Sequence, residues 1–308
     1  MACCNWGSSG IGTGFLIDYM RGERTADRLA SPDIEMLNRR SLLCFSLTGI
    51  AVLPCYGQTP LGQSFADMKS KDLQVASEAR KHVALVFEQE IPTIEKDTQL
   101  LCGSLHDSDA FIRRQAAALL TAIVLAAPEH SKVDVACFPD LVAASGDPDD
   151  TTRNDILFVL AMNPAGPPSA AHDVFVKDLD STNYRTAELA AAGLLKEGGE
   201  QKQNNELLVK AKLDNAPDAK HRLNMLYAIG GSGVQSETLL ASSRKSLSDS
   251  DPDVQRAAFQ AVAATGTKAQ VQGIMGDVAA SPSSRPEAKK QAQAILAQLQ
   301  TTQDTQRH

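Results

Sequence analysis

Apolar residues recur three or four positions apart along most of the chain, which is the spacing of an amphipathic α-helix. Ile156, Leu157 and Leu160 form one such group, and similar groups occur around residues 223–229 and 258–262. The runs follow short polar turns, and glycines such as Gly230 and Gly266 follow them as helix stops. This pattern predicts helices separated by polar turns.

A polar phrase that precedes these runs repeats at a nearly constant interval. Residues 105–117 (LHDSDAFIRRQAA) and 247–259 (LSDSDPDVQRAAF) share Leu, Asp, Ser, Asp and a β-branched residue in register. Each phrase contains an Asp that is expected to make a turn and supply a helix N-cap. The repeating anchors are Asp107, Asp147, Asp180, Asp214 and Asp249, and a weaker sixth copy starts at residue 281.

Shorter first helices are expected between these runs, at residues 93–103, 135–144, 170–179, 201–213, 235–247 and 268–279. A helix pair of this length cannot bury its apolar face alone, whereas stacked pairs can. The sequence therefore predicts an all-α fold, an α-α superhelix (solenoid) of about six helix pairs.

The repeated phrase resembles HEAT repeats, especially the short bacterial type grouped with phycobilisome-lyase HEAT-like repeats. That type has a Val-Arg pair after its Asp turn, and Ile112-Arg113 and Val254-Gln255 stand in this place. Arg153 and Lys220 fall at the same distance from their Asp anchors. The resemblance covers residues 92–300 and implies an armadillo-like superhelix that acts as a protein-binding scaffold or adaptor.

The basic residues of this slot admit two interpretations. Arg113, Arg153 and Lys220 are expected to line up along one face of the second helices. In the structural interpretation, each bonds to a neighbouring Asp turn. In the functional one, they form a binding stripe for an acidic peptide or glycan. Charge reversal at Arg113 and Arg153 separates the two, because only the first predicts a loss of folding.

The N-terminal region has the pattern of a secretory signal peptide at residues 36–57. Arg39 and Arg40 precede about fourteen mostly apolar residues, and cleavage is expected after Gly57. That run is too short to span a membrane, so no stable span is expected after cleavage. We therefore expect a bacterial protein that is periplasmic or secreted, with Met36 as a candidate start and general secretion and the twin-arginine route both open.

These features divide the chain into five parts. Residues 1–35 are interpreted as a mis-annotated or disordered extension, and residues 36–57 as the signal peptide. Residues 58–91 are expected to form an N-terminal cap, with one long helix over 65–90, ahead of the repeat domain at 92–300. Residues 301–308 are polar and are expected to be a disordered tail.

Charge and cysteine content narrow the choice of partner and compartment. The chain carries a net charge of -7, which disfavours nucleic acid and leaves a protein or peptide as the expected partner. Cys102 and Cys137 are interpreted either as a disulfide formed in an oxidising compartment or as two small buried apolar residues.

No motif for catalysis or cofactor binding stands out in the sequence. The histidines show no i, i+4 pair, and there is no nucleophile elbow, P-loop or HExxH sequence. We therefore predict no catalytic residues, no cofactor and no metal. The alternative implied by the resemblance is a cytoplasmic lyase-type enzyme that attaches a bilin to a protein cysteine.

Overall fold

The computed structural model describes residues 60–89, 97–126, 133, 135–163 and 166–305. The extension at residues 1–35 and the signal peptide at 36–57 lie outside the described residues. Every regular element within the described ranges is a helix, which confirms the all-α class. None of these helices combines the length and apolar character needed to cross a membrane.

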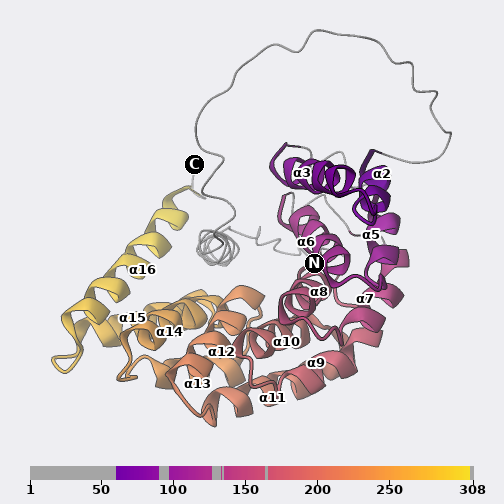
Figure 1. Cartoon of the computed structure of the whole chain (residues 1–308). Helices are drawn as coiled ribbons and strands as arrows, with labels where there is room; N and C mark the ends of the chain where they lie inside the picture. Colours follow the sequence, from indigo (N-terminus) through magenta and orange to yellow (C-terminus); the bar gives the residue numbers. More distant parts are fainter. Residues whose placement is uncertain (1–59, 90–96, 127–132, 134, 164–165, 306–308) are drawn as a thin grey trace, which may run out of the picture.

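Six helix pairs follow one another along the chain and stack into an arc (Figure 1). The second helices α6, α8, α10, α12 and α14 lie on the inner side of the arc, and α5, α7, α9, α11 and α13 lie on its outer side (Figure 1). The predicted superhelix of about six pairs is confirmed. The pairs are α5 (Thr98–Ser104) with α6 (Ala110–Ala126), α7 (Phe138–Ala144) with α8 (Asp150–Met162), α9 (His172–Asp178) with α10 (Tyr184–Lys196), α11 (Lys202–Asp214) with α12 (Ala219–Ser232), α13 (Glu237–Ser246) with α14 (Pro252–Thr265), and α15 (Lys268–Ala280) with α16 (Pro286–Thr305).

Two acidic residues stabilise the turn before α8, and two stabilise the turn before α14. The second one caps the following helix: the side chain of Asp149 accepts the backbone N–H of Thr152, and Asp251 accepts that of Val254. The first one closes the turn before it, since Asp147 Oδ1 accepts the backbone N–H of Asp149 at 2.8 Å. Asp107 and Asp249 close their turns in the same way, and in each of the three turns the side chain keeps one oxygen for another partner. In the Asp180 phrase the hydroxyl of Ser181 takes this place and accepts the backbone N–H of Asn183.

The second helices form the centre of the hydrophobic core. Every residue of α8 from Ile156 to Ala161 is buried, and Phe175 of α9 and Phe259 of α14 are fully buried beside their neighbours. The core is one continuous cluster from Leu61 to Ala292. This continuity is what a stack of pairs that cannot fold singly requires.

The two ends of the described chain differ from the sequence expectation. The single helix expected over 65–90 is wrong: α2 (Pro60–Asp67) ends at a turn, and α3 (Leu73–Gln89) begins after Asp72. Asp72 Oδ1 accepts the backbone N–H of Gln74 at 2.9 Å and so starts a new helix. In α3 the side chain of Val75 is 39% exposed, whereas Ala76 is buried. At the other end α16 is helical through residue 305, so residues 301–305 are not an irregular tail.

A disulfide joins the first two pairs. Cys102 lies in α5 and Cys137 in the short 3-10 turn Val135–Cys137 that leads into α7. Their Cα atoms are 5.6 Å apart, and the structure links them through their sulfur atoms. Of the two interpretations that the sequence left open, the structure has the disulfide.

Candidate binding surface

The basic residues singled out in the sequence occupy two different positions in the structure. Arg113 and Arg153 each stand four residues after the residue that caps their helix, Asp109 and Asp149. In α12 the cap is Asp218, so the equivalent residue is Arg222. The helix α12 begins at Ala219, two residues later than the Asp214 anchor suggested. Lys220 stands only two residues after the cap, on a different side of the helix.

Arg113 and Arg222 connect neighbouring helix pairs at the turns. Arg113 Nε donates to Asp147 Oδ2 at 2.6 Å, and its Nη1 donates to the backbone carbonyl of Asp107 at 2.9 Å. Arg222 Nε donates to Asp249 Oδ2 at 2.7 Å in the same manner. The hydrogen bond to Asp147 raises the pKa of Arg113, as expected for a guanidinium held against a carboxylate that is only 4% exposed.

The same connection occurs with lysine elsewhere in the stack. Lys69 pairs with Asp107, and Lys212 of α11 pairs with Asp180 in the preceding pair. Four of the five Asp anchors thus bind a basic side chain from a neighbouring unit. Arg153 is more local, since it pairs with Asp150 and donates to the carbonyl of Asp147. Arg113 and Arg222 therefore have a structural role, which is to connect neighbouring helix pairs.

Hydrogen bonds stabilise the charged form of Asp149 in the turn before α8. Burial would raise the pKa of this carboxyl, but hydrogen bonds from Arg114 and from Thr152 outweigh burial and lower the pKa to about 2. Arg114 belongs to the preceding pair, so this contact also ties two pairs together.

A second set of polar residues lies on the inward side of the second helices. The other sides of these helices pack against their partners, so their polar or exposed residues at helical spacing face the inside of the arc. Exposed residues of these helices include Phe111 and Arg114 on α6, and Asp253, Arg256 and Ala263 on α14. We define the central inner patch as Tyr184, Arg185, Glu188, Lys220, Asn224, Tyr227 and Arg256.

The patch is joined by contacts across α10, α12 and α14. Lys220 Nζ lies 3.7 Å from the centroid of the Tyr184 ring, a cation–π contact between α12 and α10. Arg185 donates to Glu188 at 2.7 Å, and both side chains are nearly buried. Burial raises the pKa of Tyr227, and the nearby Arg256 partly opposes this rise. Charged and aromatic groups of three successive pairs therefore lie in one cluster, in which Arg185, Glu188, Asn224 and Tyr227 are buried.

Asn224 carries the most informative atom of the patch. Its Nδ2 donates to the carbonyl of Lys220 at 2.8 Å, while its Oδ1 is buried and has no hydrogen-bond partner. A buried acceptor left unpaired costs about 1–3 kcal/mol. A ligand that brings an N–H donor to this position would remove that cost.

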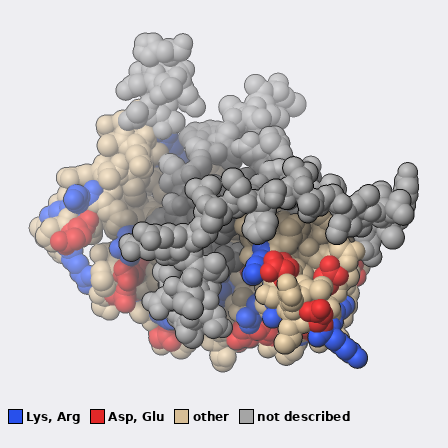
Figure 2. All heavy atoms as spheres, turned by 45° about the horizontal axis from the view of Figure 1, so that its top comes forward, with Lys and Arg blue, Asp and Glu red and all other residues tan. Residues whose placement is uncertain are grey.

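On the face that Figure 2 shows, the charged side chains of the described residues do not form a single-sign field. In the view of Figure 2, basic and acidic side chains of the described residues alternate along the rim. Among the described residues, no group of three or more His, Cys, Asp or Glu side chains is arranged to hold a metal ion.

Comparison with known proteins identifies no family. No protein-family model matches the chain, and no curated protein matches it. Two engineered proteins of the Northeast Structural Genomics Consortium are similar. One has a TM-score of 0.48 and 18% identity over 78% of this chain and 68% of its own. The other has a TM-score of 0.45 and 20% identity over 67% of this chain and 97% of its own.

A designed armadillo repeat protein in complex with the peptide (KR)4 is also similar, with a TM-score of 0.39 and 16% identity over 78% of this chain and 99% of its own. That peptide is the partner of the designed protein. The class that the helices of this chain define is an α-helical repeat solenoid.

Proposed function

We propose that this protein is a non-catalytic HEAT-type scaffold that binds an extended segment of another protein along the central inner patch. The observation that carries the proposal is the unpaired Oδ1 of Asn224, buried beside Lys220 and Tyr184. An extended peptide presents backbone N–H groups that have no internal partner. One such group fits the acceptor that Asn224 leaves open.

The rest of the patch suits the same kind of ligand. Tyrosine rings supply rigid contact area with few rotatable bonds, and cations beside them recognise carbonyl and carboxylate oxygens. Arg256 is about half exposed and projects from the pair next to Asn224. A partner segment with mixed polar and acidic side chains matches these groups better than a purely apolar one. Arg113 and Arg222 are not part of the proposed binding site, because their bonds to Asp147 and Asp249 support a structural role.

We further propose that the protein works outside the cytoplasm. Disulfides persist in oxidising compartments and are rare in cytosolic proteins. The Cys102–Cys137 bond, between two fully buried residues, supports the export expected from the leader at residues 36–57. Intact-mass measurement on cell fractions tests this, since export predicts a species that begins at Gln58 with one disulfide. A cytoplasmic, reduced species that retains Met1 would contradict export and favour the lyase alternative.

The binding proposal is tested with peptides selected from a random library on the purified full chain. The variant Asn224→Leu removes the unpaired acceptor and fills similar space. We expect unchanged or higher stability, because a buried unsatisfied atom is lost, together with at least a tenfold loss of peptide affinity.

The matched control is Asn205→Leu on the outer helix α11. Asn205 is also buried with an unpaired Oδ1, but its Nδ2 donates to the Leu194 carbonyl and to Glu197, both at 3.0 Å. This variant should lose stability and keep peptide affinity. If Asn224→Leu binds as tightly as the wild type, the inner patch is not the peptide site.

A further inference from the structure

Two neighbouring hollows lie between α13 and α15, away from the central inner patch. The first has a volume of about 340 Å³ and reaches the turn before α16, and the second has about 460 Å³ and extends toward Gln270. Arg244, Ile274 and Asp277 line both hollows. The two hollows therefore form one groove along the last two helix pairs, and neither is part of the inner patch.

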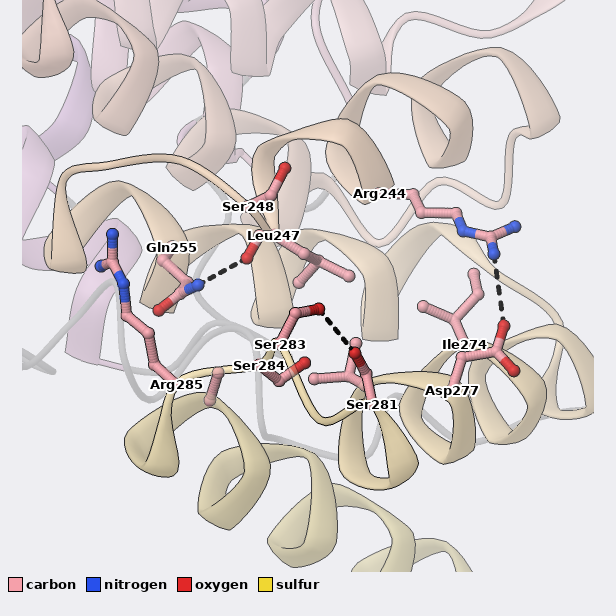
Figure 3. A pocket seen from close by; sticks show the side chains of 12 residues that line it. Arg244, Leu247, Ser248, Gln255, Ile274, Asp277, Ser281, Ser283, Ser284 and Arg285 are labelled. Atoms are coloured by element: carbon pink, nitrogen blue, oxygen red, sulfur yellow. Dashed lines mark hydrogen bonds and ion pairs between the residues drawn. The ribbon is translucent and has the colours of Figure 1, made fainter.

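The floor and the ends of this groove differ in chemistry. Leu247, Ile274 and Val278 contribute apolar side chains to the first hollow. Figure 3 shows Arg285 at one end, near Gln255 and Ser284, and the ion pair of Arg244 with Asp277 at the other end. An apolar floor flanked by an arginine suits a ligand that has an apolar side chain next to an anionic group.

Arg285 is the cation available to such a group. Its Nη2 donates to the carbonyl of Ser250 at 3.2 Å, and among the described residues it forms no ion pair with a carboxylate. A guanidinium has five N–H donors, so most of its capacity is uncommitted. Arg285 also directly precedes α16, where the helix dipole favours negative charge. By contrast, Arg244 is engaged with Asp277 at 3.3 Å.

We infer that this groove is a second binding site, which takes the C-terminal end of a peptide with an apolar last residue. The last side chain occupies the hollow over Leu247, Ile274 and Val278, and the terminal carboxylate binds Arg285 beside Ser284. The preceding residues continue along the second hollow past Gly273. The site is independent of the inner patch and does not rest on the function proposed for it.

The test measures fluorescence polarisation of the full chain with a labelled peptide, Ser-Ala-Ser-Ala-Leu, as the free acid and as the C-terminal amide. The free acid should bind at least about tenfold more tightly than the amide, by analogy with other charge-assisted contacts. Arg285→Met keeps the apolar stem and should reduce the affinity of the acid to that of the amide. Equal affinity for acid and amide, or no binding of either at millimolar peptide, would overturn the inference.

A variant that fills the second hollow without disturbing the fold separates loss of binding from loss of folding. A Cβ at Gly273 meets nothing within 4 Å, so Gly273→Leu fits the helix, raises its helix propensity and fills the second hollow. It should abolish binding of both peptides. Gly276→Leu on the same helix is the matched control, because Gly276 lines neither hollow and is equally open. If both variants reduce binding alike, the groove is not the site, and Asn224→Leu should leave this binding unchanged in either case.

Discussion

Reduction of the Cys102–Cys137 disulfide should destabilise the first helix pairs by about 4 kcal/mol. The bond closes a loop of 35 residues. In the chain-entropy model, releasing a loop of this length gives the unfolded chain about 13 cal/mol/K, which is about 4 kcal/mol at 25 °C. For a urea slope of about 3 kcal/mol/M, this corresponds to a midpoint lower by roughly 1.3 M.

The assay is equilibrium urea unfolding followed by far-UV circular dichroism, with and without reductant. The double variant Cys102→Ala, Cys137→Ala should unfold near the midpoint of the reduced wild type and should not respond to reductant. Identical curves for oxidised and reduced wild type would refute the reasoning. So would alkylation of both Cys102 and Cys137 in the protein isolated under oxidising conditions, since their sulfur atoms would then be unpaired.

Three further predictions concern the turns and the packing of the repeats. Arg113→Met leaves the buried carboxylate of Asp147 without its main partner, so the free energy of unfolding should fall by about 2 kcal/mol in urea titration. The pKa of Asp149 is lowered to about 2, so its stabilisation is complete above about pH 4 and is lost as the pH falls toward 2. The stability difference between wild type and Asp149→Asn should therefore shrink over that range. Gly193→Ala places a Cβ 2.5 Å from the ring of Phe175, so the melting temperature should fall despite a better helix former.

Controls for these variants are available in the same chain. Lys81→Met breaks the exposed pair with Glu78 and should change stability by less than about 0.5 kcal/mol. Gly276→Ala has open space around its new methyl and should stabilise α15 by up to about 1 kcal/mol. A loss of stability in either control equal to that of its test variant would show that the cited contact is not the cause. A constant difference between wild type and Asp149→Asn from pH 4 to pH 2 would contradict the lowered pKa.

The fold was predictable because the sequence of each repeat carries the same signals for a turn and a helix. Acidic turn residues such as Asp147 and Asp249 recur at an almost constant interval, and apolar residues follow at helical spacing. The expected first helices lie within a few residues of those observed, apart from the start of α5. The prediction of one long helix at residues 65–90 was wrong because the apolar spacing continues across the turn between α2 and α3. Asp72 ends this turn and caps α3.

The candidate surface was only partly predictable. Lys220 was counted from Asp214, whereas α12 is capped by Asp218 after a longer turn, so the sequence missed Arg222. Counting four residues from the capping Asp, rather than six from the first one, would have found it. The inner patch gives no short motif, because Tyr184, Asn224 and Arg256 come from three different pairs. Only the stacking of those pairs brings the three residues to one surface.

Mapping where a selected peptide touches the protein tests the central claim most directly. A peptide selected on the full chain is synthesised with a photo-activatable diazirine, crosslinked, and the attachment sites are found by mass spectrometry. Inner-patch binding predicts crosslinks on the inward residues of α10, α12 and α14, such as Lys220, Tyr227 and Arg256. Crosslinks confined to the outer helices α9, α11 and α13 would contradict it.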